Sequence, residues 1–276
     1  MKNVFLKVGI AITTIAIILV SFFLIKAKTY KVVNPVATIQ IEGYDKPIKV
    51  ELDAASAPNA VANFVKLANS GFYNDYIMTI DEDKVVSDGS KDLAKMSNLM
   101  ESPSEDYEYS IIADLPINNI ENLNRHNKGV ITMVNYYDKM FGVDSNQNNA
   151  FAEILNTANN EFALLSQDAN KYNGIFVPFG KIIEGQDVLD AISATRVEKA
   201  ADDSADTDNT ADAEITENTN NDTENTEENA EEVDMTNKIK IKSITVDTFG
   251  VDYGVPETVK FQDNLMQVYS RLYSVN

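Results

Sequence analysis

The sequence predicts a mainly β protein with one folded domain, preceded by a single transmembrane helix. Two stretches, 37–41 and Ile48–Leu52, alternate apolar and polar residues, which is typical of strands with one buried face. Residues 8–25 form an apolar run of eighteen residues without a charge, which is long enough as a helix to cross the core of a bilayer. The chain has 276 residues, 44% of them hydrophobic, which suits one substantial core with appendages.

The N-terminal segment divides into a cytoplasmic stub (1–7), a signal anchor (8–25) and a linker (26–35). A removable signal peptide is the alternative, because a basic start before an apolar run is also its design. We favour an uncleaved anchor, since Lys-Ala-Lys follows Ile25 and offers no Ala-x-Ala-like motif. Lysines flank both sides of the run, so the positive-inside rule leaves orientation open. Our hypothesis is a single-pass cell-membrane protein whose main domain is extracytoplasmic.

The acidity of the chain is concentrated in one stretch. Fourteen Asp and Glu residues and no Lys or Arg lie between Asp202 and Asp234, so this stretch carries most of the net charge of −20. Residues 199–236 have almost no aromatic or branched apolar side chains, and such a segment cannot offset its ordering entropy by burial. We predict a disordered acidic insert there. Nucleic acid is not expected as a partner, because the chain has no basic face to neutralise phosphates.

One helix is predicted on each side of this stretch. The first covers Pro58–Asn69, with a proline in its first turn and Gly71 just past its end. The second falls within residues 255–276, where Phe261, Val268 and other apolar residues recur at helical spacing. Two roles are open for the second helix: packing on the domain, or docking a partner.

The first helix belongs to a longer motif, APxxVxNFxxLAxxGFY. Its residues are Ala57, Pro58, Val61, Asn63, Phe64, Leu67, Ala68, Gly71, Phe72 and Tyr73. Further blocks are Phe179-Gly180-Lys181, Glu184-Gly185-Gln186-Asp187-Val188 and the stretch 238–253. Together they resemble the cyclophilin-type peptidyl-prolyl isomerases over 36–195 and 238–253. The resemblance implies a closed antiparallel β-barrel capped by helices within residues 36–254, interrupted by the acidic insert.

The resemblance also implies an activity that needs no cofactor and no metal. In the family, an arginine donates to the prolyl nitrogen as the peptide bond twists, apolar and aromatic walls hold the proline ring, and a glutamine helps to orient the flanking carbonyl. The implied partners are proline-containing polypeptides. Asp81, Glu82, Asp83 and Asp88 fit no defined metal-binding loop, so we predict no metal site.

The catalytic positions of the family carry other residues in this chain. Without gaps, the arginine position is Ile80, and the pocket phenylalanine, methionine and glutamine positions are Val85, Val86 and Asp88. Later positions of the pocket map to Ala163, Tyr172 and Phe176, with Lys171 before Tyr172. A gap between residues 78 and 104 would instead bring Lys84, Lys91 or Lys95 toward the place of the arginine.

Three residues remain as candidates for peptide binding: Asn135, Glu161 and Tyr172. His126, the single histidine, matches a scaffold histidine of the family, and we expect it to be structural. Two functions stay open. The first is a membrane-anchored isomerase that assists the folding of secreted proteins, with weak or lost activity. The second is a non-catalytic module that uses the same scaffold to bind a peptide or a cell-envelope protein.

Overall fold

The computed structural model describes residues 13–17, 19–21, 33–87, 109–141, 151–197 and 236–273. Of the expected anchor, residues 13–17 and 19–21 are helical, and the rest of 8–25 lies outside the described residues. No helix within the described ranges is long and apolar enough to cross a membrane. The predicted acidic insert also lies outside them, except for Thr236.

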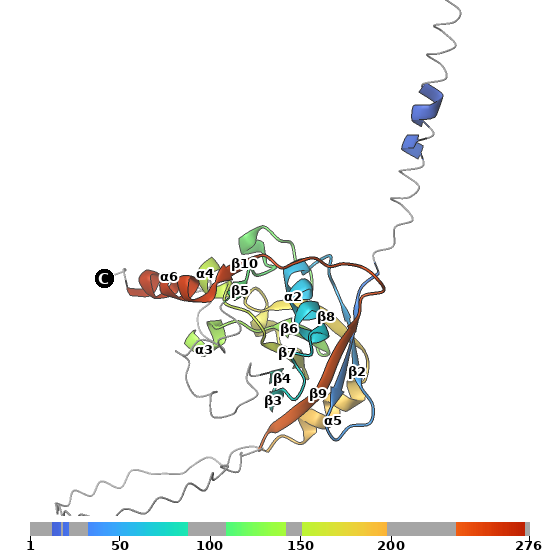
Figure 1. Ribbon diagram of the computed structural model, residues 1–276. Coiled ribbons are helices and arrows are strands. Elements are labelled where there is room, and N and C mark those ends of the chain that lie inside the picture. The colour runs from blue at the N-terminus through green and yellow to red at the C-terminus, as the bar shows by residue number, and fades with distance from the viewer. Residues whose placement is uncertain are drawn as a thin grey trace, which may run out of the picture.

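Eight antiparallel strands close into a barrel in the order β1-β2-β8-β6-β7-β4-β3-β9 (Figure 1). Their bounds are Val36–Ile41 (β1), Ile48–Leu52 (β2), Ile77–Ile80 (β3), Lys84–Ser87 (β4), Val130–Met133 (β6), Phe162–Leu165 (β7), Val177–Glu184 (β8) and Lys238–Asp247 (β9). This architecture confirms the mainly β, closed antiparallel barrel that the sequence predicts. The strand β9, which follows the acidic stretch, completes the barrel by pairing with both β1 and β3.

Two helices cover the ends of the barrel (Figure 1). These are α2 (Pro58–Asn69) and α5 (Gln186–Ala194). The remaining helical elements are η2 (Pro116–Asn118), α3 (Tyr137–Phe141), α4 (Ala152–Leu155), η4 (Asn170–Tyr172) and α6 (Phe261–Tyr273). Beside the barrel, β5 (Tyr109–Ile111) and β10 (Thr258–Lys260) form a separate two-stranded sheet.

The core is organised around Phe64 of α2. Its ring contacts three others, at centroid distances of 5.5 Å to Tyr73, 5.3 Å to Phe162 and 5.3 Å to Phe179. All four side chains are fully buried. Because aromatic side chains bury large areas, this cluster fixes α2 in the mouth of the barrel.

The N-terminus of α2 is capped by a carboxylate from elsewhere in the chain. Ala57 makes no side-chain cap, and the backbone amides of Asn59 and Ala60 donate to Asp114 at 3.2 and 2.8 Å. Burial raises the pKa of Asp114 to about 6, against the effect of these hydrogen bonds. Two amides at a helix N-terminus are natural donors to a buried carboxylate.

The C-terminal helix packs on the domain. In α6, Phe261 and Val268 are buried, and the side-chain amide of Asn264 donates to the backbone oxygens of Glu153 and Asn156 at 2.6 and 2.8 Å. Met266 is 67% exposed. The helix therefore has a packing role, and its outer side remains open to solvent at Met266.

The turn after β9 has an unusual backbone. Phe249 and Gly250 both have positive φ, 51° and 77°, and the amide of Val251 donates to the oxygen of Thr248 at 2.9 Å. Two central residues with positive φ are typical of a type I′ turn, which favours Asn-Gly. A bulky residue in this conformation is strained. Phe249 is also 53% exposed, so little packing of its ring offsets the strain.

Replacing Phe249 by asparagine is therefore expected to stabilise the domain. Asparagine adopts positive φ more readily, and we expect the free energy of unfolding to rise by about 1 kcal/mol. Urea unfolding of residues 31–276 measures this change. Phe249→Ala is the matched control, because it removes the ring but lacks the short polar side chain that favours positive φ in asparagine, so it should bring no comparable gain. A loss of stability in Phe249→Asn would show that the ring packs after all.

Candidate functional site

The register of the β3–β4 hairpin separates the positions that the resemblance assigns to the catalytic residues of the family. Ile80 lies opposite Val85, and Thr79 lies opposite Val86. Neighbouring residues of a strand point to opposite faces of the sheet, so the two pairs lie on different faces. Ile80 and Val85 are 4% and 1% exposed and belong to the hydrophobic core.

The same alternation continues into β7 and β6. Val85 pairs with Leu164, which shares its face with Phe162, the partner of Phe64 in the core. Val86 pairs with Ala163, and Ala163 pairs with Thr132. We call the Val86 side the outer face. Ile80 and Val85 thus line the inside of the barrel, whereas Val86 and Ala163 lie on the outer face, and the structure does not bring the four together.

Aromatic side chains cover the outer face. Nε2 of His126 lies 3.0 Å from the Thr132 hydroxyl, and Nδ1 lies 3.0 Å from Oδ1 of Asn173. The ring of Tyr172 lies 5.9 Å from that of His126 and stacks on Phe176 at 4.7 Å with an interplanar angle of 15°.

These side chains are packed into the fold. His126, Tyr172 and Phe176 are all buried. Burial lowers the pKa of His126 to about 4, although the hydrogen bond to Asn173 acts in the opposite direction, so the ring is neutral at pH 7. A neutral, doubly hydrogen-bonded imidazole supports the structural role expected for this residue.

A group of charged residues surrounds the Tyr172 hydroxyl, and we call it the Lys84 cluster. Its members are Asp81, Asp83, Lys84, Lys171 and Tyr172. The ammonium of Lys84 donates to the Tyr172 hydroxyl at 3.0 Å and lies 2.9 Å from Asp81 and 3.7 Å from Asp83. The Tyr172 hydroxyl donates to Asp83 at 3.0 Å, and Lys171 lies 3.0 Å from the same carboxylate.

The electrostatics of the Lys84 cluster favour its charged form. Burial lowers the pKa of Lys84, but its contacts with Tyr172 and Asp81 outweigh this effect and the net pKa is raised. Burial also raises the pKa of Asp83, and the contacts with Lys171 and Lys84 outweigh it, so that pKa is lowered. Burial raises the pKa of Tyr172 to about 12 and keeps its hydroxyl protonated. At pH 7 the cluster holds two cations and two anions that satisfy one another.

The three residues expected to bind peptide have different surroundings. The side-chain amide of Asn135 donates to the oxygens of Ile175 at 2.7 Å and Leu155 at 3.4 Å, and its oxygen accepts the amide of Tyr137 at 3.0 Å. The Asn135 side chain therefore stabilises the loop after β6. Glu161 is 6% exposed, and its backbone oxygen accepts the amide of Val134. Tyr172 is part of the Lys84 cluster.

Asp88, Lys91 and Lys95 lie outside the described residues. Of the three lysines considered as substitutes for the arginine, only Lys84 is therefore placed. Its side chain is 9% exposed and is held by two carboxylates and a hydroxyl. A cation so engaged is not available to a substrate unless these contacts break.

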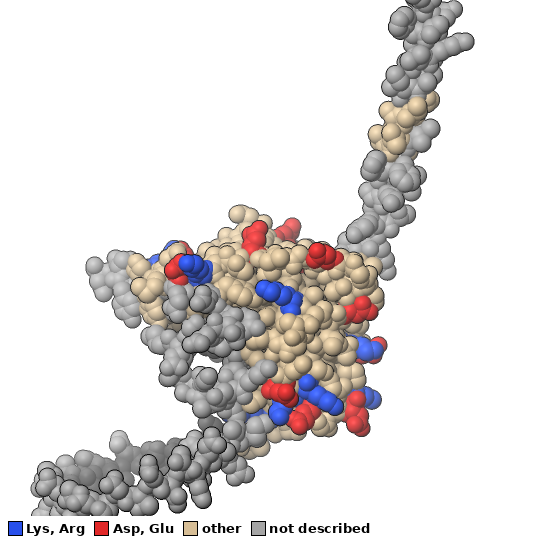
Figure 2. Space-filling model, viewed as in Figure 1, with Lys and Arg blue, Asp and Glu red and all other residues tan. Residues whose placement is uncertain are grey.

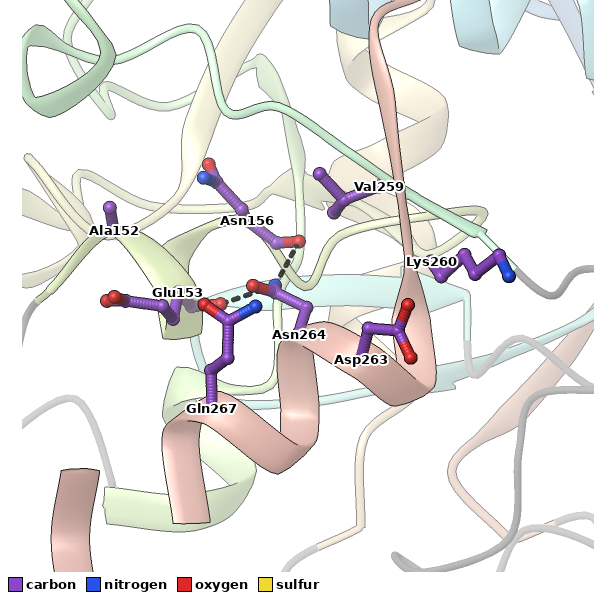
Figure 3. Close-up of a pocket in the computed structure, with 8 residues that line it drawn as sticks. All are labelled: Ala152, Glu153, Asn156, Val259, Lys260, Asp263, Asn264 and Gln267. Atoms are coloured by element: carbon purple, nitrogen blue, oxygen red, sulfur yellow. Dashed lines mark hydrogen bonds between the residues drawn. The ribbon is translucent and has the colours of Figure 1, made fainter. Parts of the chain in front are cut away.

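A separate groove lies between α4 and α6 (Figure 3). Its volume is about 400 Å³, and six of its eight lining residues are polar: Ala152, Glu153, Asn156, Val259, Lys260, Asp263, Asn264 and Gln267. The hydrogen bonds of Asn264 form part of its wall (Figure 3). Two acidic residues line the groove, Glu153 and Asp263. The carboxylate of Glu153 pairs with Arg271 at 3.2 Å, whereas Asp263 has no ion pair among the described residues.

A family model for cyclophilin type peptidyl-prolyl cis-trans isomerase/CLD matches residues 36–220, about two thirds of the chain. The chain belongs to this cyclophilin family. The match ends before β9, although β9 supplies a strand of the barrel.

Solved cyclophilin structures also align with the chain. A Cryptosporidium parvum cyclophilin type peptidyl-prolyl cis-trans isomerase has 17% identity and a TM-score of 0.48, covering 78% of this chain and 98% of the other. The same protein in the presence of the dipeptide Ala-Pro has 17% identity and a TM-score of 0.46, with 77% and 98% covered.

A run of acidic residues such as Asp81, Glu82 and Asp83 is typical of a solvated turn, and the structure differs from this at Asp83. Its side chain is only 14% exposed and pairs with two lysines. The local sequence offers one signal, Lys84 directly after the acidic residues. The other partners, Lys171 and Tyr172, lie almost ninety residues away, so only the β4–β7 pairing and the loop after β7 reveal the cluster.

The strand register can be tested with two neighbouring arginine substitutions. Ile80→Arg places a charge inside the barrel, where no partner compensates its desolvation, and should lower the free energy of unfolding by about 3 kcal/mol or more. Thr79→Arg, on the outer face, should cost less than about 1 kcal/mol. Urea unfolding followed by circular dichroism compares them. Equal losses would contradict the assignment of the two faces.

A second prediction concerns the stability that the Lys84 cluster contributes. Lys84→Met keeps most of the aliphatic volume but leaves Asp81, Asp83 and Tyr172 without their shared cation, and should cost about 2–3 kcal/mol at pH 7. Lys171→Met removes a cation from the same Asp83, but at a position 39% exposed, and should cost less than about 1 kcal/mol. Thermal unfolding of both variants checks the difference. A neutral Lys84→Met would show that the cluster contributes little stability.

Proposed function

We propose that this protein is a membrane-anchored, extracytoplasmic cyclophilin-type protein that engages proline-containing segments of polypeptides and has weak or no isomerase turnover. One observation carries the second half of this proposal. The two cations at the outer face, Lys84 and Lys171, both pair with Asp83, and the buried rings of Tyr172 and Phe176, at positions that the resemblance assigns to the family pocket, stack on each other.

The chemistry explains why these contacts matter. Rotation about a peptide bond has a barrier of about 18–20 kcal/mol, and a catalyst lowers it by stabilising the twisted state electrostatically. Losing one preorganised donor typically costs about 3 kcal/mol in the transition state. A lysine held by two carboxylates must break those contacts before it can donate to a substrate, so it replaces an open arginine poorly.

Membrane anchoring rests on the sequence. The eighteen-residue apolar run 8–25 ends eleven residues before β1 begins at Val36. Such a short linker keeps the barrel close to the bilayer, where newly exported chains emerge. A nucleic-acid partner has no support, because acidic and basic side chains are interspersed on the face shown in Figure 2.

The groove between α4 and α6 favours a second candidate function. A non-catalytic module could bind a polar or basic segment there, beside the exposed carboxylate of Asp263. The groove has the volume of a modest ligand site but a polar lining, which suits a short peptide better than an apolar ligand.

An isomerisation assay tests the proposal. Exchange NMR of a short Ala-Pro peptide with residues 31–276 should show little acceleration over the uncatalysed rate of roughly one event per tens to hundreds of seconds. Lys84→Met serves as the matched variant. Acceleration typical of the family would overturn the proposal, and its loss in Lys84→Met would identify Lys84 as the catalytic cation. Line broadening of the peptide without acceleration would support binding without turnover.

A further inference from the structure

Several exposed apolar side chains gather at the end of the barrel from which the chain leaves toward the N-terminal apolar run. They are Val33, Leu123, Phe249 and Val255, with exposures of 41%, 74%, 53% and 83%. We call them the exit-end patch. Solvent-exposed apolar residues are ordinary when single, but a group at one end calls for an explanation.

The strand pairing and one hydrogen bond place Val33, Phe249 and the segment before Val255 together. Val36, at the start of β1, pairs with Asp247, at the end of β9, so Val33 and Phe249 extend from the same end of the barrel. The hydroxyl of Tyr253 donates to the backbone oxygen of Val33 at 2.6 Å, which holds the segment before Val255 beside the N-terminal strand (Figure 1).

The contacts of the neighbouring residue, Asn124, place Leu123 at the same end of the barrel. The side-chain amide of Asn124 donates to the carboxylate of Asp53 at 3.0 Å, and Asp53 directly follows the end of β2. The amide of Leu52, the last residue of β2, donates to the oxygen of Pro35 at 2.9 Å. Leu123 therefore lies near the start of β1, as Val33 does.

Phe249 is the most informative member of the patch. Its ring is displayed at the tip of a turn whose positive φ suits asparagine or glycine. Strained conformations of bulky residues persist where the side chain has a use. Here the strained backbone directs an aromatic ring into solvent, next to the point where the chain departs.

We propose that the exit-end patch rests in the interface of the membrane that holds the N-terminal anchor. This proposal builds on the anchoring put forward above. The linker between residues 25 and 33 spans at most about 28 Å when fully extended, so the patch cannot be far from the bilayer. Aromatic and aliphatic side chains gain most at the boundary between headgroups and acyl chains.

The charges nearby define which lipid suits the patch. Asp247 and Asp252 border Phe249 and Val255, and their carboxylates accept the backbone amides of Phe249 and Gly254 at 2.8 and 2.9 Å. These two carboxylates oppose anionic headgroups and offset the attraction from Lys26, Lys28 and Lys31 in the linker. The contact is therefore an apolar one with a neutral interface, and it orients the barrel relative to the membrane.

The chain contains no tryptophan, so one substitution introduces a single fluorophore. The full chain is reconstituted in phosphatidylcholine vesicles with or without bromine near the top of the acyl chains. We expect the emission of Phe249→Trp to be quenched by the brominated lipid and shifted to shorter wavelength. Val255→Trp repeats the measurement at a second position, in case the first substitution disturbs the turn.

Val197→Trp is the matched control. Val197 is 60% exposed and bonds to Asn237, just before β9, whereas Phe249 follows the end of that strand. Ten residues of β9 separate the two positions by roughly 30 Å. The fluorophore at 197 should show neither quenching nor a shift.

Phe22→Trp, inside the apolar run, separates this inference from the anchoring itself. Quenching at 22 with none at 249 and 255 would overturn the exit-end patch and leave the anchor standing. Equal quenching at 197 and 249 would also overturn it, because the barrel would then lack a preferred orientation. No quenching at 22 would overturn the anchor and the patch together.

Discussion

The alternation of side chains in the closed barrel is the constraint on which the other features depend. Closure leaves no free edge among the eight barrel strands, so each strand is held in register by two neighbours. The contact of Phe162 with Phe64 marks the inner face, and counting along the paired strands from Phe162 assigns the residues of β7, β4 and β3 to one face or the other. A shift of one residue anywhere would exchange the two faces of a strand. The chemistry available on the outer face is thus decided by the register of β3, β4 and β7.

Packed side chains cover the outer face. Tyr172 lies over it with two aromatic neighbours, and its hydroxyl links Lys84 to Asp83. Buried charges are tolerable only when each is paired, and this requirement conflicts with catalysis, which needs a cation ready to donate to a substrate. The Lys84 cluster meets the first requirement, because each of its buried charges is paired. This pairing supports the proposal of weak or absent turnover.

Much of the fold was predictable because its signals are local. The alternation in β1 and β2 and the motif around α2 identified these elements, and the structure confirms a closed antiparallel barrel. The sequence could not assign Ile80 to the inner face, because one residue more or less in the turns between Tyr73 and β3 reverses the assignment. It could not reveal the partners of Asp83 or Asp114 either, since these contacts join residues far apart in the chain. Long-range polar contacts depend on how the chain packs, and they produce no periodic pattern in the sequence.

The long strand β9 adds a further consequence of barrel geometry. One of its ends lies beside Val197, so both ends of the acidic stretch meet where Asn237 bonds the backbone of Val197 at 2.7 and 2.9 Å. Its other end lies beside the start of β1, where the chain turns toward the apolar N-terminal run. Strands of an antiparallel barrel carry their two ends to opposite rims, so the attachment points of the acidic stretch and of the apolar run are separated by the length of the barrel. If the proposed anchor lies in a bilayer, this separation keeps the base of a strongly acidic segment away from anionic lipid.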